Sequence, residues 1–186
     1  LWNLPNFYRY SNGDIYYISP DNKVFILADG ASGAGEAGKV LMGEICIEMV
    51  KSFDYSTSNL DAKDYIDKLL WKINNRLIEV SQEYKKLVFG TIDIAVFDKG
   101  ILTITTIGDS PVFYFDGVEV KRTAKNKKKY EWMIDEGYIT RDQYEGYIKK
   151  MYHMMWSCFD CFIPDIVPNY IIEQYEVKPN NALFMC

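Results

Sequence analysis

The sequence predicts an α+β protein in which two antiparallel β-sheets pack face to face between helices, an α-β-β-α layered sandwich. Three observations lead to this prediction. The chain opens with short strand-like segments joined by tight turns, which indicates a meander rather than a βαβ crossover. Two long segments with helical periodicity follow, and most of the remainder is again strand-like. The length of 186 residues suits one domain, and we expect residues 1–186 to form it.

The opening meander consists of three predicted strands, at residues 7–10, 14–18 and 23–28. An Asn-Gly pair separates the first two strands, and Asn-Gly between strand-like residues is a strong hairpin signal. A Pro-Asp-Asn turn leads into the third. The third strand is a continuous apolar run, which is typical of a buried strand.

Two helices are predicted next, at residues 35–53 and 61–84. Apolar side chains recur at helical spacing along both, so each helix should bury one face. The two stripes consist of Val40, Leu41, Ile45, Met49 and Val50, and of Ile66, Leu69, Leu70, Ile73, Leu77 and Val80.

Four further strands are predicted at residues 91–97, 101–107, 112–115 and 118–120, each separated from the next by a glycine-containing turn. The first of them places its isoleucines and a valine on one face, at every second residue. A lysine-rich run follows at residues 121–129 and is expected to be a solvated loop.

The last part of the chain has a mixed pattern. Two short helices are expected at residues 131–136 and 141–150, with Thr140 as the N-cap of the second. Two final strands are expected at residues 170–177 and 182–186. The sequence stops inside the last of these strands.

Composition excludes several classes of function. The net charge of −5 argues against nucleic acid as a partner, because phosphate backbones select for basic surfaces. No apolar stretch is long enough to span a bilayer, and the first residues lack the pattern of a signal peptide. The placement of the 4 cysteines does not indicate a disulfide framework, so we expect a reducing, cytoplasmic setting.

The apolar run at residues 24–28 stops at Asp29-Gly30, and a glycine-dense loop follows. A carboxylate at the end of a buried strand, beside backbone that is free to bend, could hold Mg²⁺ or Mn²⁺ through oxygen ligands. A plain strand-to-helix turn explains the same residues, with Asp29 as a cap. Since Asp-Gly is a common turn dipeptide, this stretch alone favours the turn.

Two more aspartates lie at strand ends beside glycine, Asp14 after Gly13 and Asp109 after Gly108. Hard divalent cations collect carboxylates from separate strands, so the three aspartates together suggest a dispersed metal centre. Arg9 lies shortly before Asp14 and could hold a phosphate through two parallel hydrogen bonds. Taken singly, each of these residues has an ordinary explanation as a turn or surface residue.

Other catalytic chemistries have weaker support. The pair Cys158 and Cys161 forms a C-x-x-C, but a zinc site needs a second pair or suitably spaced histidines. His153 is the only histidine, which argues against a His-based triad. The glycine loop after Asp29 lacks the Gly-Lys-Ser/Thr of a P-loop.

An ordered series of motifs runs through nearly the whole chain. It includes an Arg-x-x-Asn-x-Asp opening, an Asp-Gly motif with following glycines, Gly-Thr before a strand, and Gly-Asp-Ser after one. The segments are Arg9 to Asp14, Val24 to Ala37, Phe89 to Thr91, Thr106 to Ser110, Trp132 to Tyr144 and Lys178 to Cys186. In this order and spacing, the sequence resembles the metal-dependent serine/threonine protein phosphatases of the PPM (type 2C) family.

The resemblance implies roles for individual residues. Asp29 would bridge two Mn²⁺ or Mg²⁺ ions, with the Gly30 carbonyl as a further ligand and Asp14 contributing to the same centre. Asp109 matches the position that serves a third, weaker metal site, and Arg9 matches the phosphate-binding arginine. A metal-activated water would attack the phosphorus of phosphoserine or phosphothreonine on a protein substrate. Independently of the resemblance, we expect a monomer that needs neither nucleic acid nor a membrane.

The sequence also departs from the family pattern. Ile92 replaces the second Thr of Gly-Thr-Thr, Pro111 replaces an Arg, and the sequence ends before the Ser-Asp-Gly motif that supplies further metal ligands. We therefore expect the phosphatase-like domain to be truncated at its C-terminal side, and residues 1–186 alone to be weakly active or inactive. Two alternatives stay open: a catalytically inactive pseudophosphatase that acts as a binding or regulatory module, and an unrelated α+β binding domain.

Overall fold

A computed structural model describes residues 14–31, 35–85, 88–108, 110–123, 134–143 and 170–186. Strands and helices follow the predicted order, with one additional short 3₁₀ helix, η3. The strands are β1 (Asp14–Ile18), β2 (Val24–Gly30), β3 (Gly90–Asp98), β4 (Ile101–Ile107), β5 (Val112–Phe115), β6 (Val120–Thr123), β7 (Ile172–Glu176) and β8 (Ala182–Met185). The helices are α1 (Gly35–Ser52), η3 (Tyr55–Thr57), α2 (Ala62–Tyr84) and α4 (Arg141–Gln143).

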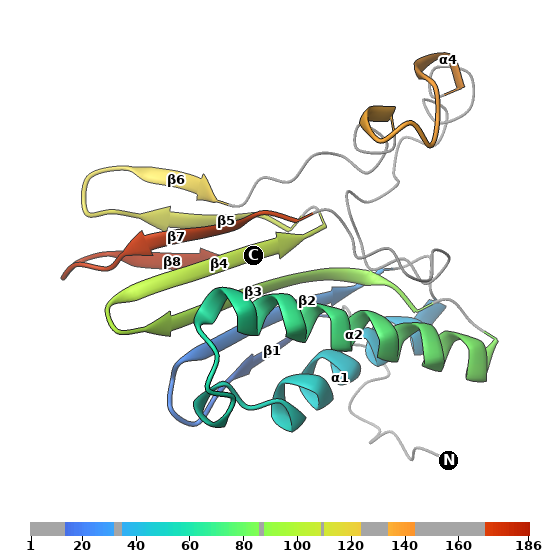
Figure 1. Cartoon of the computed structure of the whole chain (residues 1–186), viewed down its shortest axis with the longest axis horizontal. Coiled ribbons are helices and arrows are strands. Elements are labelled where there is room, and N and C mark those ends of the chain that lie inside the picture. Colours follow the sequence, from blue (N-terminus) through green and yellow to red (C-terminus); the bar gives the residue numbers. More distant parts are fainter. Residues whose placement is uncertain (1–13, 32–34, 86–87, 109, 124–133, 144–169) are drawn as a thin grey trace.

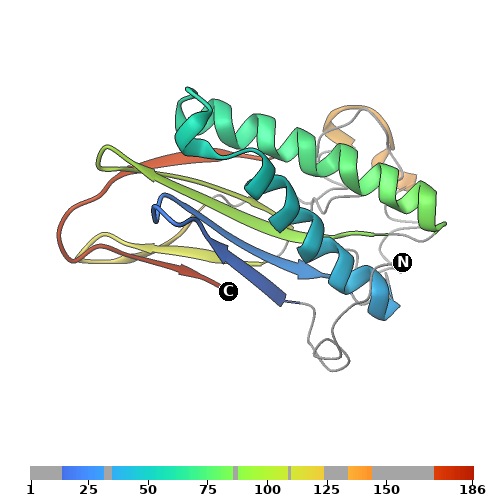
Figure 2. The same ribbon diagram turned by 90° about the horizontal axis from the view of Figure 1, so that it is seen from below.

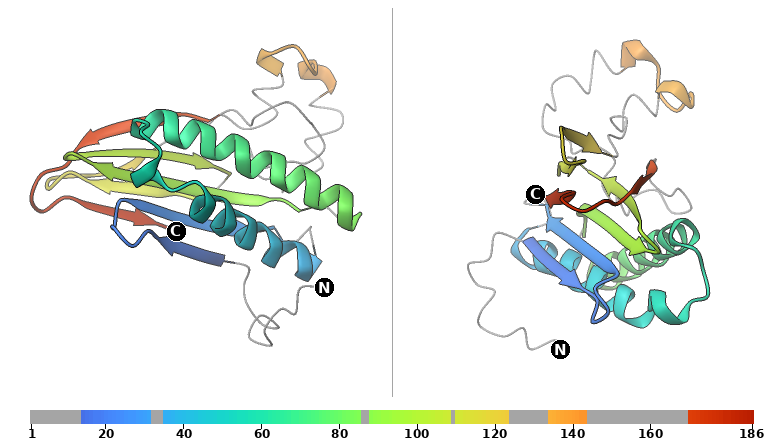
Figure 3. Two further views of the ribbon diagram at one scale, coloured as in Figure 1. Left: turned by 60° about the horizontal axis from the view of Figure 1, so that its bottom comes forward. Right: turned by 90° about the vertical axis from the view of Figure 1, so that its left-hand side faces the viewer.

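The strands form two antiparallel sheets, as the sequence predicts. A five-stranded sheet has the order β1-β2-β3-β4-β7, and a three-stranded sheet has the order β6-β5-β8 (Figure 1). Helices α1 and α2 cover one face of the larger sheet, and the smaller sheet lies on the other side (Figure 2). Figure 3 shows the same layers along the strands and across them. The expected α+β sandwich fold is confirmed.

The main core lies between the larger sheet and the two long helices. Alternate residues of β3 are fully buried there, as the predicted strand requires, and they pack against the apolar stripe of α2. Helix α2 begins after Asp61, whose side chain accepts a hydrogen bond from the Asp64 amide at 2.9 Å. It ends at Lys85, which adopts the left-handed conformation common at helix C-termini.

A second, smaller core lies between the sheets. Ala95, Leu102 and Ile104 from the larger sheet pack with Val112 and Tyr114 from β5. Because side chains alternate along a strand, every residue of β3 that shares a face with Ala95 also points into this inter-sheet space. This rule assigns the polar residues of the candidate site to their face.

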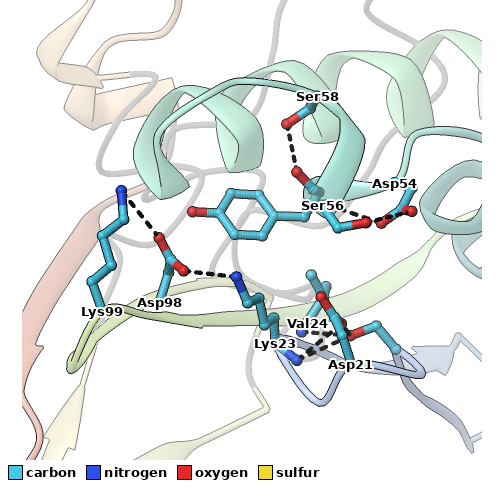
Figure 4. A network of polar contacts seen from close by, with 10 residues as sticks. Asp21, Lys23, Val24, Asp54, Ser56, Ser58, Asp98 and Lys99 are labelled. Atoms are coloured by element: carbon cyan, nitrogen blue, oxygen red, sulfur yellow. Dashed lines mark hydrogen bonds and ion pairs between the residues drawn. The ribbon is translucent and has the colours of Figure 1, made fainter.

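Polar contacts fasten the end of the larger sheet where β2 begins and β3 ends. Lys23 Nζ lies 2.9 Å from Asp98 Oδ1, and the backbone amide of Lys23 donates a hydrogen bond to Asp21 Oδ1 (Figure 4). Hydrogen bonding to Lys23 lowers the pKa of the Asp98 carboxyl. This pair joins the two neighbouring strands at the end opposite to Asp29.

Several element boundaries differ from the prediction. Strand β2 does not stop before Asp29 but continues through Gly30, because its ladder with β3 extends to the Gly30–Gly90 pair. The strand predicted at residues 118–120 is β6, Val120–Thr123, since Asp116 Oδ1 accepts the amides of Val118 and Glu119 and holds them in the turn.

The rest of the predicted tail is only partly described. Thr140 does cap α4, because its Oγ1 accepts the Gln143 amide at 3.2 Å while Gln143 Oε1 accepts the Thr140 amide. The strand predicted at residues 7–10, and most of both predicted short helices, lie outside the described residues. Within the described ranges, no helix is both long and apolar enough to cross a membrane.

Candidate metal centre

Two of the predicted ligands, Asp14 and Asp29, face each other at one end of the larger sheet. Asp14 is the first residue of β1, and its register partner in β2 is Asp29. Directly opposed residues of an antiparallel pair lie about 4.5–5.5 Å apart at Cβ and share a face of the sheet. The fold therefore brings these two carboxylates together from segments separated by a hairpin.

Both carboxylates lie on the face that turns away from the helices. Val24, Ile26 and Ala28 are buried in the core beneath α1 and α2, so alternation places Asp29 on the inter-sheet side. Asp29 is half-buried and Asp14 is exposed. The pair thus lies at the rim of the inter-sheet space, where a solute can reach it.

Two like charges directly opposite each other destabilise a sheet. A divalent cation held between the carboxylates would offset this repulsion, and carboxylate oxygens are the ligands that Mg²⁺ and Mn²⁺ prefer. Asp29 is a strand residue with partners on both sides, Asp14 and Thr91, and not a helix cap. The simple turn that Asp29-Gly30 suggested in isolation is therefore wrong.

Gly30 lets helix α1 cross the end of β2 at close range. A Cβ at position 30 would lie 2.1 Å from the backbone oxygen of Lys39 in α1, far inside van der Waals contact. Its register partner Gly90 is constrained in the same way, because a Cβ there would lie 2.2 Å from the Asp29 carbonyl oxygen. Close packing of backbone explains both glycines, and the role of the Gly30 carbonyl as a ligand stays a prediction.

The loop after β4 is tied to the strand next to Asp29. Thr91, the β3 partner of Asp29, has its Oγ1 2.7 Å from Ser110 Oγ. Gly108 has a φ of 115°, which favours glycine, and a Cβ there would lie 2.5 Å from Thr91 Cγ2. The residues on both sides of position 109 are therefore held against β3, whereas Asp109 and Arg9 themselves lie outside the described residues.

Asp93 is a polar residue at the site that the sequence interpretation missed. It lies in β3 on the same face as Thr91 and Ala95, and it is 0% exposed. Its register partners are Leu27 in β2 and Thr106 in β4. Asp29 is thus a diagonal neighbour of Asp93, one residue pair nearer the rim.

The environment of Asp93 disfavours its charge. Burial raises the pKa of this carboxyl to about 7, and the nearby Thr106 hydroxyl acts in the opposite direction. Neither carboxylate oxygen has a hydrogen-bond partner of good geometry, although Thr106 lies close enough to influence the pKa. Buried polar atoms in native proteins nearly always have a partner, so this group requires an explanation.

One signal in the sequence could have revealed Asp93. It is the only charged residue within the otherwise uncharged segment 88–97, and alternation places it opposite the isoleucine face. The prediction for this strand concerned only that apolar face, whose residues are buried as expected. The other face carries the polar residues Thr91 and Asp93.

The donor atoms fit the predicted ions in kind. The described candidates supply oxygen only, and the buried Asp93 carboxylate lacks a partner such as a cation would provide. In the described part of the chain, no three His, Cys, Asp or Glu side chains are grouped so that they could hold an ion. A complete ligand set therefore needs donors besides these side chains, such as backbone carbonyls and water. Cys158, Cys161 and His153 lie outside the described residues.

Neither a protein-family model nor a curated protein matches the sequence. Solved structures do match it. The serine/threonine phosphatase PstP/Ppp of Mycobacterium tuberculosis has a TM-score of 0.68 at 19% identity, over 95% of this chain and 72% of that chain. The catalytic domain of PstP in complex with 2 manganese ions has a TM-score of 0.69 at 20% identity, over 95% and 71%.

A third similar structure is the serine/threonine phosphatase of S. agalactiae, with a TM-score of 0.64 at 16% identity, over 95% of this chain and 73% of that chain. At such identities the likeness establishes the fold. The fold of the PPM-type serine/threonine phosphatases, expected from the sequence motifs, is therefore confirmed for this chain.

Proposed function

We propose that this chain, which has the fold of the metal-dependent serine/threonine phosphatases, hydrolyses phosphoserine and phosphothreonine on proteins by means of a metal-activated water. One observation carries the proposal: within this fold, Asp14 and Asp29 are register partners at the rim of the inter-sheet space. Two opposed carboxylates at an accessible rim can bind a divalent cation. A bound divalent cation can in turn activate water and neutralise charge during hydrolysis of a phosphoester.

Asp29 and Asp14 would hold Mn²⁺ or Mg²⁺, with the Gly30 carbonyl as a further ligand. Two ions are proposed there, and Asp109 would serve a third. When bound, such ions lower the pKa of water and neutralise charge on phosphoryl oxygens. Arg9 would bind the phosphate of the substrate by two parallel hydrogen bonds.

The residues next to Asp29 support this proposal. The absence of side chains at Gly30 and Gly90 allows α1 and β3 to hold the end of β2 from both sides, which limits the movement of Asp29. The Thr91–Ser110 contact holds Ser110 against the strand next to Asp29. Preorganised donors of this kind need little rearrangement during reaction.

The partner proposed for the site is a phosphorylated protein substrate. The net charge of −5 opposes an anionic phosphopeptide, so cations at the rim would also aid substrate binding. The same negative net charge argues against nucleic acid as a partner, because phosphate backbones bind basic surfaces. We further propose that it acts as a monomer in the cytoplasm, without a membrane partner.

A pseudophosphatase with the same fold is the second candidate. It is favoured by the small number of described ligands, because no group of three metal-binding side chains occurs in the described part of the chain. Such a module would bind phosphorylated protein without hydrolysing it. Metal-dependent turnover separates the two candidates.

The test is hydrolysis of p-nitrophenyl phosphate by the full-length protein with added Mn²⁺ or Mg²⁺. We expect activity with either ion, none in EDTA, and a loss of about a hundredfold or more in Asp14→Ala. Glu44→Gln, which removes a half-buried carboxylate on α1, is the matched control and should keep wild-type activity. Equal rates with and without EDTA would overturn the proposal.

A further inference from the structure

The inter-sheet space changes character along its length. At the end away from Asp29 it contains a cavity of about 320 Å³ with a mainly apolar lining, which includes Phe25, Tyr114 and Leu183. At the Asp29 end, Thr91, Asp93 and Thr106 are polar and almost fully buried. The buried carboxyl group of Asp93 therefore lies among polar side chains and not in the apolar core.

The groups that face Asp93 do not neutralise it. The residues that adjoin it on the same face are Leu27 and Asp29 on β2, Thr106 on β4, and Thr91 and Ala95 on β3. Among the described residues, no Lys or Arg forms an ion pair with Asp93, and the nearest charged residue along the ladder is the like-charged Asp29. An ionised Asp93 would therefore be stable only beside a bound cation.

The register makes such a cation reachable from both carboxylates. Diagonal neighbours in an antiparallel sheet are roughly 7 Å apart, still within reach of one another's longer side chains. A Mg²⁺–oxygen bond of about 2.1 Å on each side helps an ion to bridge that gap. A site with two carboxylates, completed by hydroxyl, carbonyl and water oxygens, is an ordinary composition for Mg²⁺.

We propose that Asp93 is a further ligand of the candidate metal centre and shares one divalent cation with Asp29 inside the inter-sheet space. This inference rests on the proposed function only in assuming that Mn²⁺ or Mg²⁺ binds near Asp29. It explains why the chain keeps a carboxyl group whose oxygens lack well-placed partners in a fully buried position. It also places one ion deeper than the Asp14–Asp29 rim.

The experiment is a titration of the full-length protein with Mn²⁺ alone, by isothermal calorimetry at neutral pH. Asp93→Asn is nearly isosteric and should weaken one Mn²⁺ site about tenfold or more, since an amide is a poorer ligand than a carboxylate. Glu44→Gln removes a carboxylate whose Oε2 also has no hydrogen-bond partner, but on α1. This control should bind Mn²⁺ as the wild type does.

A second measurement needs no variant. Mn²⁺ broadens the NMR signals of nearby groups. Thr106 is the register partner of Asp93 on β4, whereas Asp29 lies on β2, on the other side of β3. We expect one equivalent of Mn²⁺ to broaden the Thr106 methyl signal as strongly as that of Leu27. A sharp Thr106 signal, or an unchanged affinity in Asp93→Asn, overturns the inference.

The outcomes keep this inference apart from the proposed function. Mn²⁺-dependent hydrolysis together with wild-type Mn²⁺ affinity in Asp93→Asn would refute the Asp93 site and leave the phosphatase standing. Mn²⁺ binding that depends on Asp93, without hydrolysis of any phosphoester, would support the site and refute the phosphatase. A wild-type protein that binds no Mn²⁺ would refute both.

Discussion

Replacement of Asp93 by asparagine should change how the stability of the metal-free protein depends on pH. An unfolded aspartate ionises with a pKa of 3.8, whereas burial raises the pKa of Asp93 in the folded protein to about 7. Between these two values the folded state holds a proton that the unfolded state has lost. The free energy of unfolding therefore falls as the pH rises through this window, and it levels off above pH 7.

The magnitude follows from the two pKa values. Each pH unit within the window is worth about 1.4 kcal/mol, so the full penalty at neutral pH is about 4 kcal/mol. About 2 kcal/mol of it develops between pH 5 and pH 7, because the slope already declines as the pH approaches the folded-state pKa. Asparagine fits the same space and does not titrate, so Asp93→Asn should gain about this much stability over the wild type as the pH rises.

The assay is urea unfolding of both proteins in EDTA at pH 5, 6, 7 and 8. The difference in the free energy of unfolding between Asp93→Asn and the wild type should grow from pH 5 to pH 7 and then change little up to pH 8. Glu44→Gln is the control: burial raises the pKa of Glu44 too, but this side chain is partly exposed, so its difference should vary much less with pH. A difference that does not depend on pH would show that Asp93 is hydrated or paired, and would refute the reasoning.

Four further variants test the packing and hydrogen bonds of the fold. Gly30→Ala should cost about 3 kcal/mol of stability in urea unfolding, because the new Cβ meets the Lys39 backbone. Gly100→Ala, which places its Cβ in open space at a φ of 79°, should cost only about 1 kcal/mol. Equal costs for the two variants would show that the Lys39 backbone does not restrict position 30. Asp61→Ala should cost about 1 kcal/mol through loss of the α2 cap, measured in the same way. Tyr114→Phe should cost about 1 kcal/mol, because the hydroxyl donates to Asn181 Oδ1 at 2.7 Å; no change in either variant would show that these bonds do not form.

Periodicity was sufficient to predict most of the fold. The isoleucine face of β3 and the stripe of α2 are both buried in one core, because repeated apolar spacing leaves few other ways to exclude these side chains from water. Turn chemistry located most loops but not the start of β6. There the Asp116 side chain accepts hydrogen bonds from the amides of Val118 and Glu119, so the strand begins only after these residues. The alternation of apolar residues does not reveal such side-chain hydrogen bonds.

The candidate site could be predicted only in part. Motif order suggested Asp14 and Asp29, and the register between β1 and β2 makes them partners. The same motifs indicate Arg9 and Asp109, which lie outside the described residues and remain predictions. Asp93 is visible in the sequence as the only charged residue of segment 88–97, but its importance depends on which face of β3 is covered by the second sheet, and this is a matter of tertiary packing.

The most direct test of the account is the rate at which the full-length protein releases phosphate from a phosphothreonine peptide. We expect release in Mn²⁺, none in EDTA, and a loss of about a hundredfold or more in Asp29→Ala, with Glu44→Gln unaffected. Release that persists in EDTA, or an Asp29→Ala variant as active as the wild type, would contradict a phosphatase built around Asp14 and Asp29.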